Sequence, residues 1–201
     1  MENGKSTNHY KYFSRFEHQF CQLADFITVP VEEAKDEYYQ KYRSKMHVIP
    51  QGFEFDVEDL KIAVPRKSTN TPIKFAYAGL LQPDYRNPKK LLELLSALDV
   101  AFEFHVFSAH PDLTTPFETA LKNKLYLNKS LPRNQLLVEL RKMNFLLNLE
   151  NENLPGQIPS KLIDYTILRK PILNIQPNHP NKELVIEFLK GDFSNSLEVK
   201  N

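Results

Sequence analysis

Three short stretches of this 201-residue sequence carry residue types that bind anions. The first begins with Ser160 and Lys161, which open a short helical pattern that runs into the apolar segment 172–175. Serine is a favourable helix N-cap, and first-turn amides beside a lysine suit a phosphate group. Asp164 follows three residues later and shares a helix face with Lys161. The alternative is an ordinary capped helix in which Lys161 and Asp164 form a solvated ion pair.

The second stretch covers residues 77–95, where an apolar strand pattern ends at Gly79 and a polar loop carries Arg86. Asn87 and Pro88 then have the residue types of a helix N-cap and a first helical residue. Arg86 is therefore expected where the carboxyl end of a strand meets a helix N-terminus. A guanidinium there can bind an oxyanion through two N–H groups. The alternative is a surface arginine in a loop.

The third stretch covers residues 126–140, where a strand pattern ends near Leu127 and a polar loop contains Lys129. Pro132 opens the next helical pattern. Such a loop could hold a flat base against its backbone amides, so Lys129 is a third candidate for nucleotide binding. The alternative is a plain connection between a strand and a helix.

The residue types that mark other chemistry are scarce in this sequence. Cys21 is the only cysteine, and the six histidines show no HExxH spacing, so we predict no metal site. Neither GxGxxG nor GxxxxGK[ST] occurs, no catalytic residue can be named, and we expect no cofactor. From spacing alone, the chain reads as a Rossmann-like module that binds anions.

The composition is that of a soluble globular protein, with 41% hydrophobic and 25% charged residues. A formal net charge of +1 gives no global field for nucleic acid, so we expect no nucleic-acid partner. The single cysteine fits a reducing compartment. The polar first residues do not resemble a signal peptide, and no apolar run approaches the about 20 residues that cross a bilayer. We expect a cytoplasmic protein with at most peripheral membrane contact.

Strand and helix patterns alternate along most of the chain, which favours an α/β fold with a Rossmann-like parallel sheet and helices on both faces. Near-continuous apolar strands are typical of such a sheet. Strand patterns lie at 26–29, 47–49, 73–78, 102–107, 124–127, 144–148 and 171–175. Helical patterns lie at 15–23, 31–45, 88–98, 115–122, 132–142, 161–170 and 181–190.

Four segments, in this order, resemble motifs of retaining GT-B glycosyltransferases of the type called glycosyl transferases group one. They are LADFITVPVEEAKDEYYQKYRSKMHVIPQGFEFD, FAYAGLLQPDYRNPKKLLELLSAL, LNKSLPRNQLLVELRKMNFLLNLEN and IPSKLIDYTILRKPILNI. The resemblance spans about residues 22–190. It implies that residues 1–50 are the last helix-strand units of a GT-B N-terminal domain. Residues 51–72 would be a linker, and 73–201 a donor-binding domain that is incomplete at its C-terminus.

The resemblance also implies roles for single residues. Arg86 corresponds to the basic residue that holds the donor diphosphate, although Leu80 stands where the family has an arginine after the glycine. Ser160 and Lys161 correspond to the phosphate-binding helix start. Asp164 corresponds to the acid that binds the ribose, and is shorter than the usual glutamate.

One acid of the family's pair is missing, because its position falls on Gly156. Glu150 or Glu152 is a possible substitute. This departure bears on sugar recognition more than on nucleotide binding.

The resemblance implies a metal-independent glycosyltransferase with a nucleotide-diphosphate sugar as donor. A carbohydrate or lipid-linked acceptor would bind through the missing N-terminal domain, so the isolated chain is expected to be inactive. Two alternatives stay open: a nucleotide-sugar 2-epimerase of the same fold, and a non-catalytic nucleotide-binding or docking module.

Overall fold

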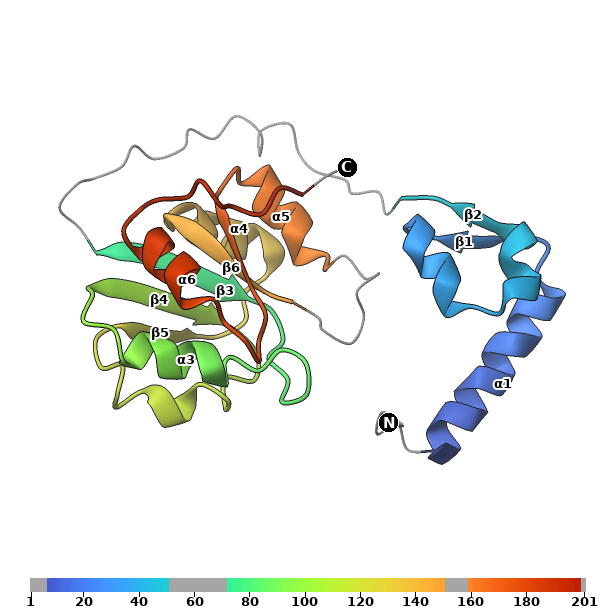
Figure 1. The fold of residues 1–201 in the computed structure, drawn as a ribbon, viewed down its shortest axis with the longest axis horizontal. Helices are drawn as coiled ribbons and strands as arrows, with labels where there is room; N and C mark the ends of the chain where they lie inside the picture. The colour runs from blue at the N-terminus through green and yellow to red at the C-terminus, as the bar shows by residue number, and fades with distance from the viewer. Residues whose placement is uncertain (1–6, 51–71, 151–158, 200–201) are drawn as a thin grey trace. The chain divides into compact units, whose positions relative to one another are not determined.

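The computed structural model describes residues 7–50, 72–150 and 159–199 (Figure 1). The chain forms two compact units, Met1–Glu54 and Phe55–Asn201. Nearly all of the predicted linker lies outside the described residues, as do Glu152 and Gly156.

The first unit has a very small apolar core. Cys21, Tyr42 and Met46 are buried together, and the two short strands pair in parallel with Ile27 opposite Met46. The elements of this unit are α1 (Thr7–Leu23), β1 (Ile27–Val29), the 3₁₀ segments η1 (Glu32–Glu37) and η2 (Gln40–Lys45), and β2 (Met46–Val48).

The helix predicted over residues 31–45 is wrong, because the backbone is extended at Tyr38 and Tyr39 and separates two 3₁₀ segments. Tyr42 is buried, and its hydroxyl lies 3.1 Å from Nδ1 of His18 on α1. These contacts with α1 outweigh the helical preference of the charged segment, since propensity is a weak guide against tertiary packing.

The second unit contains a five-stranded sheet in which every pair of neighbours is parallel, as predicted. The strand order is β5-β4-β3-β6-β7 (Figure 1). The chain therefore runs outward from β3 to β5 and then returns to build β6 and β7 on the other side of β3. The strands are β3 (Ile73–Ala78), β4 (Phe102–Phe107), β5 (Leu125–Asn128), β6 (Phe145–Leu149) and β7 (Ile172–Ile175).

Helices cover both faces of this sheet. The predicted helical stretch at 115–122 is wrong in extent, since only a 3₁₀ turn forms there and Leu121 packs into the core beyond it. The other helices predicted in this unit form with ends shifted by at most three residues, whereas α1 of the first unit begins eight residues before the predicted start at residue 15. The helical segments of this unit are α3 (Lys89–Ser96), η3 (Thr115–Phe117), α4 (Arg133–Arg141), α5 (Lys161–Ile167) and α6 (Lys182–Leu189).

Alternate residues of each strand contribute side chains to two apolar layers, one on each face of the sheet, because successive side chains of a strand point to opposite faces. Phe75 stacks against Phe104 and Phe145 at centroid distances of 4.5 and 4.6 Å, in the layer beneath α3 and α6. Ala76 and Leu146 belong to the other layer, beneath α4 and α5. Double burial accounts for the near-continuous apolar strands.

Candidate functional site

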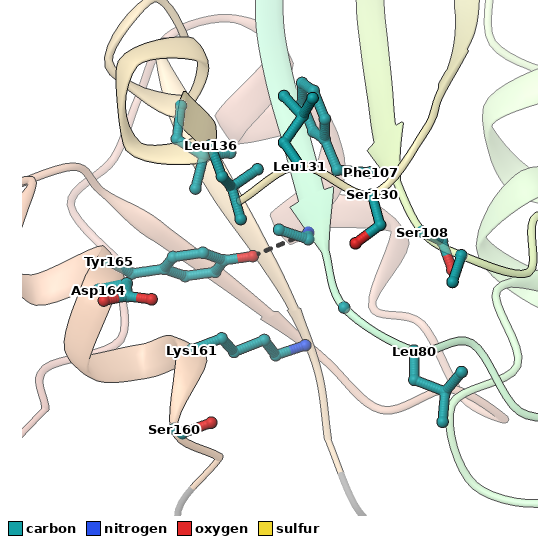
Figure 2. A pocket seen from close by; sticks show the side chains of 14 residues that line it. Leu80, Phe107, Ser108, Ser130, Leu131, Leu136, Ser160, Lys161, Asp164 and Tyr165 are labelled. Carbon is teal, nitrogen blue, oxygen red and sulfur yellow. Dashed lines mark hydrogen bonds between the residues drawn. The ribbon is translucent and has the colours of Figure 1, made fainter. Parts of the chain in front are cut away.

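The candidate site is a cavity of about 360 Å³ in the second unit, where β3 and β4 end (Figure 2). It lies where the strand order reverses beside β3, and in open parallel sheets ligands bind at the carboxyl ends of the strands at such a point. The lining comes from the ends of β3 and β4, the loop before α4, α4 itself and α5. Of the predicted site residues, the structure brings Gly79, Ser160, Lys161 and Asp164 to this cavity.

Lys161 supplies the main cation of the cavity. Its side chain extends from α5 toward the carboxyl end of β3 (Figure 2), where Nζ lies 4.1 Å from the centroid of the Tyr77 ring. Nζ is buried and has no hydrogen-bond partner among the described residues. Burial, and secondly the positive charge of Arg86, hold the pKa of Lys161 well below its ordinary value. The Lys161–Asp164 ion pair of the alternative reading therefore does not form.

The Tyr77 ring beneath this ammonium is itself held in place. Its hydroxyl donates a 2.9 Å hydrogen bond to the carbonyl of Leu80. Burial raises the pKa of Tyr77 to about 12, so the ring stays neutral and offers Lys161 only its π face. A cation–π contact replaces few of the hydrogen bonds that an ammonium makes in water, which leaves Lys161 able to bind an anion.

Gly79 allows the chain to turn at the end of β3. Its φ of 139° lies in a region that L side chains rarely adopt. A Cβ at this position would lie 3.6 Å from Oη of Tyr77 and 4.0 Å from Cδ of Lys161. The turn therefore depends on the backbone freedom of glycine, and it leaves the backbone close to Lys161.

Arg86 does not line the cavity, but its charge reaches Lys161 and contributes to the lowered pKa there. Its backbone pairs with that of Gln82 and closes the loop after β3, with N–H to O distances of 3.1 and 3.4 Å. Its Nε is buried without a hydrogen-bond partner in the described part of the chain. Two cationic side chains thus lie near one strand end, each with a buried N–H donor that no described residue accepts.

Asp164 has a partner that the sequence did not indicate. Its Oδ1 accepts from Arg133, the first residue of α4, at 2.9 Å from Nε and 2.7 Å from Nη2. The two residues are 31 positions apart. An arginine at the start of a helix beside a predicted site was the available signal, but nothing in the sequence paired it with Asp164.

Ser160 lines the cavity, but the prediction that its side chain caps the helix is wrong. Ser160 already has helical dihedrals, with φ −54° and ψ −30°, and its hydroxyl makes no capping hydrogen bond. The amide of Leu162 instead donates to the carbonyl of Pro159 at 2.9 Å. Ser160 is thus already part of the first helical turn, whereas an N-cap residue lies just before that turn. At α3 the predicted cap forms in part, since Oδ1 of Asn87 accepts from the amide of Lys89 at 3.0 Å.

Lys129 does not reach this cavity. It lines a neighbouring cavity of about 520 Å³ together with His105 and Glu139, and the two cavities share Phe107 and Leu131. The predicted grouping of Lys129 with Lys161 in one cavity is therefore not seen.

Glu150, a possible substitute for the missing acid, follows β6 and accepts a hydrogen bond from the side chain of Asn174. Among the residues that the structure describes, no group of three or more histidine, cysteine or acidic side chains could hold a metal ion. Over the same residues, no helix is long and apolar enough to cross a membrane.

No protein-family profile matches the sequence, and no curated protein matches it. Solved structures do match. The lipopolysaccharide outer core galactosyltransferase WaaB in its apo form has a TM-score of 0.63 at 13% identity, over 93% of this chain and 57% of that one. HepE from Anabaena in complex with UDP-glucose has a TM-score of 0.63 at 11% identity, over 94% and 60%. A glycosyltransferase from Rickettsia africae has a TM-score of 0.58 at 16% identity, over 96% and 58%.

The chain therefore has the fold of GT-B glycosyltransferases, as the sequence motifs indicated. It spans 57–60% of the length of these solved structures. At 9–16% identity the likeness establishes the fold, and the chemistry has to be argued from the site.

Proposed function

We propose that the cavity beside β3 binds the nucleoside diphosphate part of a nucleotide-sugar donor, and that the whole protein transfers the sugar to an acceptor. The observation that carries this proposal is the buried ammonium of Lys161, which has no hydrogen-bond partner among the described residues and lies at the carboxyl edge of a parallel sheet. A buried charge without a hydrogen-bonded partner is costly, and an anionic ligand would compensate it.

In this proposal the diphosphate contacts Lys161 in the cavity and extends toward Arg86, whose charge reaches Lys161 although Arg86 lies outside the lining. When the bond between the sugar and the diphosphate breaks, negative charge grows on the leaving diphosphate, and two fixed cations in a partly dry site stabilise that charge. Leu80 stands in place of the family's arginine after the glycine, so Arg86 is the residue that supplies the guanidinium. The proposed reaction needs no metal ion, because these side chains balance the charge.

The nucleoside would occupy the part of the cavity lined by Ser130 and Asp164. The Asp164 carboxylate can accept hydrogen bonds from ribose hydroxyls, and the loop before α4 offers backbone groups to a base. HepE is described as a complex with UDP-glucose, which supports a nucleotide sugar as the ligand class. We assign binding of a carbohydrate or lipid-linked acceptor to the part of the solved structures that this chain does not cover.

Titration of the chain with UDP, GDP and ADP tests the proposal. A ligand that binds only the folded state raises its stability by about 2.7 kcal/mol at a concentration of 100 times Kd, so one nucleotide should raise the melting temperature. Lys161→Ala should reduce this rise by about half or more, because a tenfold weaker affinity leaves about 1.4 kcal/mol at the same ligand concentration. Lys90→Ala, which breaks an exposed ion pair with Glu93, should keep the full rise.

If none of the three nucleotides raises the melting temperature of the parent chain, this result would contradict a donor site and favour the docking module. If one nucleotide binds, its sugar conjugates can be supplied to a protein that also contains the acceptor-binding part. Transfer to an acceptor supports the glycosyltransferase, whereas a changed sugar on the same nucleotide identifies the epimerase.

A further inference from the structure

The contact between Arg133 and Asp164 joins two helices at the rim of the cavity. Arg133 begins α4, and Asp164 lies on α5. Both N–H groups of Arg133 converge on Oδ1 of Asp164, at 2.9 and 2.7 Å. The side chain of Asp164 is 21% exposed and that of Arg133 is 45% exposed. The contact is thus accessible to a ligand rather than sealed in the core.

The geometry of this contact leaves half of the carboxylate for a ligand. An ionised carboxylate has about four acceptor positions on two oxygens. Because both Arg133 donors lie on Oδ1 and no described residue donates to Oδ2, the lone pairs of Oδ2 remain for groups that enter the cavity. A hydroxyl pair on a sugar ring is a suitable donor, since each hydroxyl can donate one hydrogen bond.

The contact with Arg133 also bears on which cation pairs with the Asp164 carboxylate. Asp164 and Lys161 are three residues apart on one helix, a spacing at which opposite charges pair readily. Lys161 nevertheless has no hydrogen-bond partner among the described residues, while Asp164 is held by Arg133. Without Arg133, the Asp164 carboxylate could form an ion pair with Lys161. Neither side chain would then be available to bind a ligand.

We propose that Arg133 is a positioning residue that fixes the Asp164 carboxylate for recognition of the vicinal ribose hydroxyls and keeps it away from Lys161. This inference rests on the proposed nucleotide-diphosphate site and adds to it a residue to which the motif resemblance assigns no role. In the proposed arrangement Arg133 acts only through Asp164 and contacts neither the phosphates nor the ribose. Its effect is therefore expected in the choice between ribose and deoxyribose more than in affinity for phosphate.

The test compares a ribonucleoside diphosphate with its 2′-deoxy form. The probe is whichever of UDP, GDP and ADP binds the parent chain most tightly, measured by calorimetric titration beside the 2′-deoxy diphosphate. The parent should prefer the ribose form by about tenfold, the size expected for a hydrogen bond to a charged group. Arg133→Ala should reduce this preference to about twofold or less and should weaken the ribose form.

Two further variants separate positioning from simple loss of charge. Arg133→Lys keeps the charge but cannot place two fixed N–H donors on one oxygen, so it should restore only part of the preference. Asp164→Asn should lose the preference, and Arg133→Ala should add nothing to it in the double variant. Lys142→Ala, which breaks the exposed pair with Glu139 at the other end of α4, should keep the parental preference.

The outcomes distinguish this inference from the proposed function. If the parent binds none of the three diphosphates, the proposed function fails and the inference fails with it. If the parent binds and Arg133→Ala keeps the tenfold preference, only the inference is overturned. Tighter ribose binding by Arg133→Ala also overturns it, because Arg133 would then compete with the ligand. Melting temperatures of all variants confirm that the differences arise in folded protein.

Discussion

The phenolic oxygen of Tyr165 bridges the ends of two neighbouring strands. It accepts a hydrogen bond from the amide of Ala78 in β3 at 3.1 Å and donates one to the carbonyl of Leu147 in β6 at 3.3 Å (Figure 2 shows the first). The two strands pair directly only at Phe75 and Ala76. A side chain thus replaces the backbone ladder where the strands reach the cavity, and it satisfies two backbone groups there.

Tyr165→Phe should destabilise the second unit. The change leaves an amide and a carbonyl without this partner in a buried place, which costs about 1–3 kcal/mol per unsatisfied group. Urea unfolding should show a lower midpoint with an unchanged slope. Tyr126→Phe is the control, because its hydroxyl bonds the carbonyl of Asn123 at the exposed surface. Equal stability of the two variants would mean that water reaches the strand ends and replaces the phenol.

Lys161→Met should have opposite effects on stability and on binding. Methionine keeps much of the side-chain volume and removes a charge whose Nζ is buried without a hydrogen-bond partner, so the ligand-free protein should melt higher than the parent. Nucleotide affinity should fall by about tenfold or more, the loss expected for a hydrogen bond to a charged group. A variant that melts lower and binds as the parent does would show that Lys161 is structural.

The lowered pKa of Lys161 predicts a pH dependence with a definite sign. Between its folded and unfolded pKa values the unfolded chain binds more protons at this residue, so its contribution makes stability rise with pH. The penalty from the buried charge is complete below the folded pKa and disappears above the ordinary lysine value. The melting-temperature gap between Lys161→Met and the parent should therefore shrink as pH rises toward the ordinary lysine pKa of about 10.4.

The same shift predicts proton uptake when a nucleotide diphosphate binds. The anion stabilises the protonated lysine, so its pKa rises in the complex and affinity should fall as pH increases through the folded pKa. Calorimetric titration at several pH values below the ordinary lysine pKa of about 10.4, each in two buffers with different ionisation enthalpies, measures the uptake. Lys161→Met serves as the control and should take up fewer protons. A parent that takes up none would contradict the link between the buried ammonium and the ligand.

Gly79→Ala should destabilise the protein by more than about 1 kcal/mol, because alanine is strained where φ is positive. The variant should also bind nucleotide more weakly, since the turn lies beside Lys161. Gly191→Asn is a matched control: its φ of 80° is closer to the left-handed region that asparagine tolerates, so the change should cost less. Thermal unfolding of both variants makes the comparison, and equal losses would contradict the special role of Gly79.

The sequence determined the architecture of the second unit because that information is local. The apolar runs at 75–77 and 145–147 needed burial on both faces, and the helical periods between the strands required crossover connections, so a parallel sheet followed. The glycine at the end of β3 and the lysine that opens α5 were found in the same way. Each needed only its own strand end or helix start to be recognised.

Tertiary structure decided which of these residues act together. Arg133 and Asp164 come from different helices, and their contact depends on how two crossovers return to the sheet. Lys129 leaves its strand in the expected loop, yet the position of α4 directs it to another cavity. Burial of the Lys161 ammonium over Tyr77 likewise depends on packing of α5 against β3. The helix predicted at 31–45 is interrupted because its contacts with α1 outweigh a weak local preference for helix. The sequence of this segment alone does not reveal those contacts.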